Sequence, residues 1–160
     1  MTSHREVVKA PASVVWRLLL DKIRRPDKYV PGVEKVEVVA ELGPDSIERK
    51  MWTGDGKMIH EIIGADATTR TVIFRSHATH PVFSGFVTNT VLPAEGSAEP
   101  VGADVEPAEC ILDYSLNWSP KAGAPEQAVS AAREAMPKSI RGAVIGTKKL
   151  AEDAVGQASE

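Results

Sequence analysis

The sequence is poor in cysteine, carries no strong excess of either charge and has no long apolar run. Because Cys110 is the single cysteine, the chain has no partner for an intramolecular disulfide and no cysteine-based zinc cluster. The formal net charge is −3 at pH 7 and no basic stripe with interleaved aromatic residues is present, so we expect no nucleic-acid partner. No apolar stretch approaches the roughly 18–20 residues that span a bilayer, so we expect no membrane span.

Several motifs of nucleotide and ester chemistry are also missing. The sequence has no Gly-x-Ser-x-Gly, no P-loop and no dinucleotide glycine pattern, and we expect no cofactor. Residues 1–6 lack the basic and then apolar arrangement of a signal peptide, and the single cysteine suits a reducing compartment, so the expected location is the cytoplasm. The residues that are present, 42% hydrophobic and 26% charged among 160, suit a single globular domain over residues 1–160.

The N-terminal part predicts a strand, a short helix and a second short helical piece. Residues 3–9 have strand character, and Pro11 suits a first helical turn, where its missing N–H costs nothing. Apolar residues then recur at helical spacing, namely Ala12, Val15, Trp16, Leu19, Leu20 and Ile23. The opposite side is expected to carry the charged residues Arg17, Asp21 and Lys22, so the apolar side must pack on the rest of the protein.

Six further strands are expected before the C-terminal third. Their ranges are 33–41, 46–53, 57–63, 71–77, 83–92 and 110–118. The pair Asp55-Gly56 predicts a hairpin turn. The last strand alternates most cleanly, with Cys110, Leu112, Tyr114, Leu116 and Trp118 on one face, which we expect to be buried and concave. Residues 93–108, rich in Pro, Ala, Gly and Glu, are expected to form a mobile loop.

The C-terminal third predicts one long amphipathic helix from about 125 to 155, with a frayed tail after 156. Pro137 is expected to kink or divide it. The expected buried stripe consists of Val129, Ala132, Met136, Ile140, Ala143, Thr147, Leu150 and Ala154. Consecutive strands with short turns imply an antiparallel sheet, and the helix must lie on its concave face. The prediction is therefore an α+β fold in which a curved antiparallel sheet of about seven strands wraps around the long helix, with two short helices after the first strand and an apolar internal cavity.

This layout resembles the helix-grip fold of the SRPBCC superfamily, which includes START domains, polyketide cyclases and the birch pollen allergen. The matching residues are Ala10-Pro11-x-x-Val14-Val15-Trp16-x-x-Leu19, Asp21, the segment 26–33, the Arg49 strand, Glu61-Ile62-Ile63 and the long final helix. Within this superfamily, the chain resembles the AtaL-like group in three features, namely His80-Pro81-x-Phe83-x-Gly85, Asn89 and Leu112-x-Tyr114-x-Leu116-x-Trp118. The resemblance implies a cavity for hydrophobic or aromatic molecules and, in some members, polyketide cyclisation. The sequence has no diagnostic catalytic motif that would assign the activity of any superfamily member to this chain.

Arg49 and His60 are the first candidate site residues. A two-residue Asp55-Gly56 loop pairs residue 51 with 60 and residue 50 with 61, which places Arg49, Met51 and His60 on one face. Lys50 and Glu61 would then form an ion pair on the other face. On a concave face, Arg49 could hold a carboxylate or enolate oxygen and His60 could move protons. The alternative inverts the faces and puts Trp52, Ile59 and Ile63 inside.

Tyr114 and Asn89 are candidate polar contacts of a ligand; a tyrosine bonded to backbone and an asparagine facing water are the alternatives. His60, Arg49 and Tyr114 are the candidates for catalysis. The full predicted ligand-binding set is Trp16, Arg49, Met51, His60, Phe86, Asn89, Leu112, Tyr114, Leu116, Trp118, Met136, Ile140 and Ala143. His77 and His80 are spaced His-x-x-His, but zinc needs three or four ligands, so we expect a solvated loop pair and no metal.

Three functional hypotheses follow from these residues. The first is an enzyme that cyclises or aromatises a polyketide-like substrate, and the second is a carrier of a small hydrophobic or lipid-like molecule. The third is a protein-interaction or co-chaperone-like module, which would have a filled core and an exposed apolar patch. A monomer and a homodimer are both compatible with the sequence.

Overall fold

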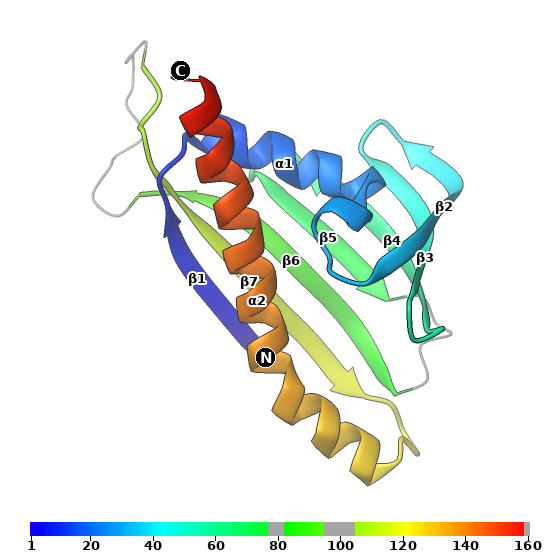
Figure 1. The fold of residues 1–160 in the computed structure, drawn as a ribbon. Helices are drawn as coiled ribbons and strands as arrows, with labels where there is room; N and C mark the ends of the chain where they lie inside the picture. Colours follow the sequence, from blue (N-terminus) through cyan, green and yellow to red (C-terminus); the bar gives the residue numbers. More distant parts are fainter. Residues whose placement is uncertain (77–81, 95–104, 159–160) are drawn as a thin grey trace.

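The computed structural model describes residues 1–76, 82–94 and 105–158. The expected helix-grip fold is confirmed: the strands of these residues form one curved, seven-stranded antiparallel sheet in the order β1-β7-β6-β5-β4-β3-β2, and the long helix α2 lies across it (Figure 1). The strands are β1 (Thr2–Val8), β2 (Val33–Gly43), β3 (Ser46–Thr53), β4 (Met58–Asp66), β5 (Thr71–Ser76), β6 (Phe83–Pro93) and β7 (Cys110–Pro120).

The connection between β1 and β2 contains one helix, not two. Helix α1 (Ala12–Arg24) is followed by a single 3₁₀ turn, η1 (Pro26–Lys28), where the sequence predicts a second short helix. Pro26 explains this change, because it lacks the N–H that would continue α1. The end of α1 lies over the inner face of the sheet, and η1 then leads the chain to β2 (Figure 1).

Helix α2 (Glu126–Ala158) continues through Pro137 without being divided and ends beyond the predicted boundary at 156. Its buried side chains are Ile140, Val144, Thr147 and Ala151. The predicted stripe is wrong at its C-terminal end: Leu150 and Ala154 are exposed, because the helix turns Val144 and Ala151 toward β1, β7 and α1 instead.

The core lies between the inner face of the sheet, α1 and the second half of α2. Fully buried members come from each layer, namely Val15 and Leu19 from α1, Val72 and Leu112 from the sheet, and Val144 from α2. The alternation predicted for β7 holds, since Cys110, Leu112, Tyr114 and Leu116 are buried on the inner face. Two predictions lie outside the described residues. They are the pair His77 and His80, which we expect not to bind a metal, and most of the loop predicted for residues 93–108.

Candidate ligand-binding cavity

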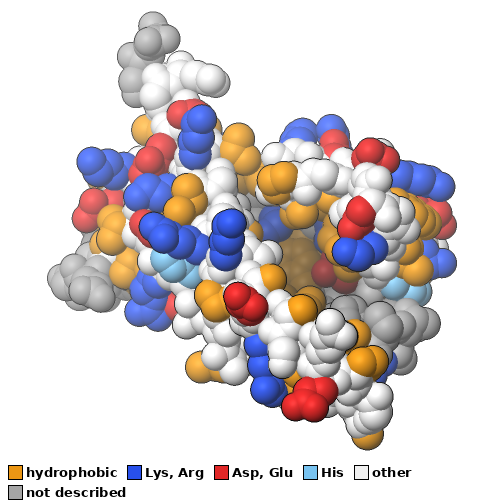
Figure 2. All heavy atoms as spheres, turned by 60° about the horizontal axis from the view of Figure 1, so that its bottom comes forward, with side chains coloured by type: hydrophobic (Ala, Val, Ile, Leu, Met, Phe, Trp, Pro, Cys, Tyr) orange, Lys and Arg blue, Asp and Glu red, His pale blue; other side chains and the backbone are white. Residues whose placement is uncertain are grey.

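A cavity of about 250 Å³ lies between the sheet, the end of α1 and the middle of α2. Figure 2 shows a hollow in one face of the molecule, with hydrophobic side chains inside it. The apolar lining consists of Val30, Met51, Phe74, Val87, Leu116, Trp118, Met136, Ile140 and Ala143. The polar lining consists of Lys22, Arg49, Glu61, Asn89, Tyr114 and Ser139. The cavity is thus mostly apolar, with a few polar groups that could orient a ligand.

The pairing of β3 with β4 differs by one residue from the predicted pairing. Met51 lies opposite Ile59, and Arg49 lies opposite Glu61. The loop between the strands has three residues, because Thr53 N donates to Lys57 O at 3.0 Å and Gly56 adopts a positive φ of 77°. A three-residue hairpin with glycine in the left-handed region is a common alternative to a two-residue turn. A shift of one residue in the pairing exchanges the two faces of a strand, so the side chains of β4 that face the cavity are those predicted to face outward.

The new register removes His60 from the cavity. It lies on the outer face opposite Lys50, with its Nε2 2.6 Å from Glu48 Oε1. The predicted ion pair between Lys50 and Glu61 is also absent, since Glu61 lies on the inner face and pairs with Arg49. The inner face therefore contains Arg49 and Met51, as the first prediction had it. It also contains Ile59 and Ile63, as the alternative with inverted faces had it.

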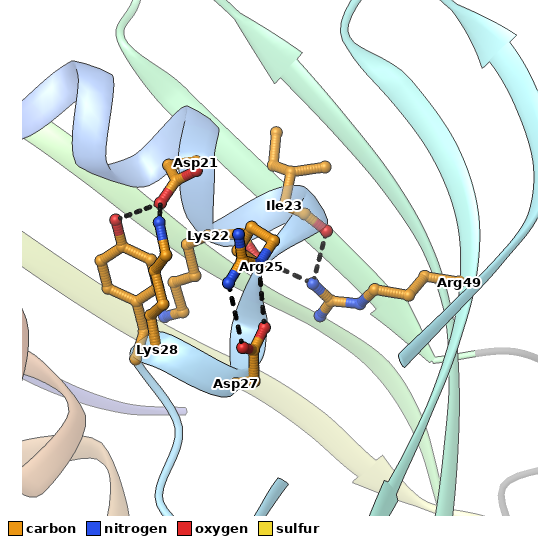
Figure 3. A network of polar contacts seen from close by, with 8 residues as sticks. Asp21, Lys22, Ile23, Arg25, Asp27, Lys28 and Arg49 are labelled. Carbon is orange, nitrogen blue, oxygen red and sulfur yellow. Dashed lines mark hydrogen bonds and ion pairs between the residues drawn. The ribbon is translucent and has the colours of Figure 1, made fainter. Parts of the chain in front are cut away.

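Arg49 joins the sheet to the end of α1. Its Nη1 donates to the carbonyl oxygens of Lys22 at 2.9 Å and Ile23 at 2.6 Å (Figure 3). Its Nη2 donates to Glu61 Oε2 at 2.6 Å. The carbonyls of a helix's last turn lack partners within the helix and attract cations, so Arg49 caps α1. Its side chain is 2% exposed, and its Nε–H has no acceptor among the described residues.

Lys22 is the site residue that the sequence prediction placed on the wrong side. Arg17 is exposed as expected, and Asp21 turns outward to bind Lys28 Nζ at 3.0 Å and Tyr29 Oη at 2.9 Å (Figure 3). Lys22, by contrast, is only 7% exposed and lines the cavity. The signal was present in the spacing, because Lys22 follows Val15 by seven residues and therefore continues the apolar side of α1.

A short chain of hydrogen bonds connects Lys22 to α2. Lys22 Nζ lies 3.4 Å from Tyr114 Oη, Tyr114 Oη lies 2.9 Å from Thr147 Oγ1, and Thr147 Oγ1 donates to Ala143 O at 3.1 Å. Since Thr147 donates to a carbonyl, it accepts the proton of Tyr114, and Tyr114 accepts from Lys22. The Asn89 amide pairs donors with acceptors when its nitrogen donates to Thr88 O and its oxygen accepts from Lys22 Nζ at 3.0 Å.

Burial changes the ionisation of both cavity groups. It lowers the pKa of Lys22 from 10.5 to about 8; the charge of Glu61 opposes this fall and that of Arg49 adds to it. Burial also raises the pKa of Tyr114 far above its ordinary value, with the Thr147 hydrogen bond acting weakly in the other direction. At neutral pH, Tyr114 is therefore a neutral phenol. Lys22 titrates close to physiological pH, so both its charged and its neutral form are populated there.

Lys22 should make the stability of the protein depend on pH. Between pH 8 and 10.5 the unfolded chain keeps a proton on Lys22 that the folded chain has lost, so stability rises with pH across this window. We expect the free energy of unfolding of the wild type, relative to Lys22→Met, to rise by about 3 kcal/mol from pH 8 to 10.5. Urea unfolding of both proteins at several pH values measures this, and parallel curves would contradict it.

Eight further members of the predicted set line the cavity together with Arg49: Met51, Asn89, Tyr114, Leu116, Trp118, Met136, Ile140 and Ala143. Phe86 does not, because it alternates with the inward Val87 and is 40% exposed on the outer face. Leu112 is fully buried in the core near the start of β7, away from the cavity lining. Trp16 is half-buried and packs against the core from the first half of α1, whereas the cavity is lined by Lys22 near the end of that helix. Whether the lining residues contact a ligand remains a prediction.

The family of the chain is decided by its match to a family model. The model described as AtaL, acetylaranotin biosynthesis cluster protein L, matches residues 8–155. The chain belongs to the AtaL family. The predicted resemblance to the SRPBCC superfamily and its AtaL-like group is thereby confirmed for this AtaL-family protein. None of the helices in its described part is long and apolar enough to cross a membrane.

Solved structures share the fold of this AtaL-family protein at low sequence identity. Zhui aromatase/cyclase from Streptomyces sp. R1128 is 20% identical, with a TM-score of 0.69 over 96% of this chain and 94% of that one. TTHA0849 from Thermus thermophilus is 17% identical, with a TM-score of 0.65 over 96% and 97%. Norcoclaurine synthase from Thalictrum flavum is 17% identical, with a TM-score of 0.63 over 95% and 93%. No protein with a curated description matches the chain.

Proposed function

We infer that this protein binds a small aromatic or polyketide-like molecule in the cavity, with an oxygen atom of that molecule held by Lys22 and Arg49. The observation that carries this proposal is the buried Arg49 Nε–H, which has no acceptor among the described residues and belongs to a side chain that lines an apolar cavity. A buried donor without a partner costs about 1–3 kcal/mol. A carboxylate, enolate or phenolate oxygen would supply the missing acceptor.

The size of the cavity supports a compact ligand. Its volume of about 250 Å³ lies just below the roughly 300–1,000 Å³ of typical ligand pockets. One or two fused rings would fill it, whereas a long acyl chain would not. A larger polyketide could place one end inside and extend through the open side of the cavity beside Ser139 of α2, which is exposed.

Two further observations support this choice of ligand class. The family model is named after a biosynthesis cluster, and one structural neighbour is an aromatase/cyclase. The protein-interaction alternative requires a filled core, and the cavity argues against it. We place the protein in the cytoplasm, as its single cysteine led us to expect.

Naphthoate, a two-ring aromatic carboxylate, tests this function by isothermal titration calorimetry. We expect saturable binding of one molecule, and we expect naphthylmethanol, which lacks the charge, to bind more weakly. Hydrogen bonds to charged groups contribute roughly 1.5–3 kcal/mol, so Lys22→Met should reduce the preference for naphthoate over naphthylmethanol at least tenfold.

A matched pair of helix variants provides the control. Ser139→Phe places a bulky ring in the lining and should weaken naphthoate binding at least tenfold. Ser130→Phe places the same ring at another exposed position of α2, outside the lining, and should leave binding unchanged. Equal affinities for the two variants, or no binding by the wild type, would refute the proposal.

A further inference from the structure

Lys22 has the surroundings of a nucleophile rather than those of a structural cation. Its amine lies in a mostly apolar cavity, over the rings of Tyr114 at 4.6 Å and Phe74 at 5.4 Å. Among the described residues no carboxylate lies within ion-pair distance of Nζ, since the nearby Glu61 binds Arg49 instead. A lysine kept only for its charge would be expected to have such a partner.

The hydrogen bonds of Lys22 leave its reactive electrons free. Both polar partners of Nζ, the Tyr114 hydroxyl and the Asn89 amide oxygen, act as acceptors, because Tyr114 gives its own proton to Thr147. A neutral amine has two N–H bonds and one lone pair. The two acceptors engage the two N–H bonds, and no described donor competes for the lone pair, which leaves it for a molecule in the cavity.

We propose that Lys22 forms an imine with the aldehyde or ketone carbonyl of an apolar ligand. The lone pair of Nζ attacks the carbonyl carbon, a C–N bond forms, and the oxygen takes one proton from the nitrogen to give a carbinolamine. The C–O bond then breaks, the hydroxyl group takes the second nitrogen proton, and water leaves, so that a C=N bond remains. No oxidant or other reactant is needed. The proposal rests on the proposed function, since the carbonyl compound must first occupy the cavity.

The charges around Lys22 favour this reaction near neutral pH. Arg49 on β3 and Glu61 on β4 are the charged groups that act on Lys22, and Tyr114 on β7 is a neutral phenol. Because burial lowers the pKa of Lys22 to about 8, a useful fraction of the amine is neutral at physiological pH. Arg49, with its unused Nε–H, can stabilise the oxygen that gains charge during the attack.

Reductive trapping tests the proposal directly. The full chain is incubated at pH 7.5 with naphthaldehyde and cyanoborohydride, which reduces an imine to a stable amine, and the adduct is located by peptide mass spectrometry. We expect labelling of Lys22 at least tenfold above that of the exposed Lys149. Excess naphthoate should prevent labelling at Lys22 only. Lys22→Arg should lose the adduct, while Lys149→Arg should keep it.

The outcomes separate this proposal from the proposed function. Naphthoate binding without a Lys22 adduct would overturn imine formation and leave the binding function in place. Labelling of Lys22 no faster than of exposed lysines, or labelling that naphthoate does not reduce, would also overturn it. If naphthoate itself does not bind, the proposed function fails, and the imine fails with it. Protection by naphthoate is measured on the wild type, so this test does not depend on how any variant folds.

Discussion

Replacing Arg49 by methionine is expected to lower the free energy of unfolding by about 3–5 kcal/mol, the usual cost of breaking one side of a buried ion pair. The side chain of Arg49 is 2% exposed and that of Glu61 is 15% exposed, so the carboxylate would be left with little water to replace its partner. The same change leaves the carbonyls of Lys22 and Ile23 without their donor. This second loss falls on the end of α1, which positions Lys22.

Urea unfolding followed by circular dichroism measures this effect, with Arg24→Met as the matched control. Arg24 also forms a two-bond pair with a carboxylate, Glu41, but both side chains are about half exposed. Exposed pairs contribute roughly 0.2–1 kcal/mol, so the control should lose no more than this. Equal losses for the two variants would contradict the buried role of Arg49.

A double variant separates the two roles of Arg49. In Arg49→Met combined with Glu61→Leu, the unpaired carboxylate is gone, but the two helix carbonyls still lack a donor. We expect this variant to recover part of the stability lost by Arg49→Met, because replacing a buried ion pair with apolar side chains is often close to neutral. The remaining deficit would measure the capping of α1. Full recovery would mean that capping contributes nothing.

The fold could be predicted because its signals are repeated along the chain. Alternation in β7, helical spacing in α1 and α2, and turn residues between them agree on one architecture, and the boundaries of β3 match the prediction at both ends. The register between β3 and β4 depends instead on a single loop. Asp55-Gly56 is compatible with loops of two or three residues, and the difference decides whether His60 or Glu61 faces the cavity.

Lys22 was missed for a different physical reason. A rule based on polarity assigns lysine to solvent, because burying its charge is costly. Here the cost is reduced by two hydrogen-bond acceptors and two aromatic faces, supplied by β5, β6 and β7. These partners are distant in sequence, and only the folded sheet brings them beneath α1. A charged residue at an apolar helical position is the signal that sequence reasoning should follow toward a site.

Replacing Gly85 by alanine is expected to destabilise the protein by about 4 kcal/mol or more, among the largest effects of a single substitution. Gly85 lies in β6 opposite Trp118 and has a φ of 136°, a backbone angle that residues with a Cβ rarely adopt. An added Cβ would lie 2.0 Å from Asn117 O and 3.0 Å from Trp118 Cα. Both contacts are with backbone, so no flexible side chain can move aside, and the β6–β7 pairing itself must shift.

The consequence of this shift should reach the cavity through Trp118. Its ring lines the cavity and stacks on Phe83, with the ring centroids 5.6 Å apart, so moving its backbone should change the near-ultraviolet circular dichroism and weaken naphthoate binding. Gly64→Ala is the control within the same sheet: its Cβ would meet only Ser46 Oγ, at 3.8 Å, and its φ is not in the left-handed region. The control should stay within about 0.5 kcal/mol of the wild type. If Gly85→Ala did the same, the close approach of β6 to β7 would not constrain this wall of the cavity.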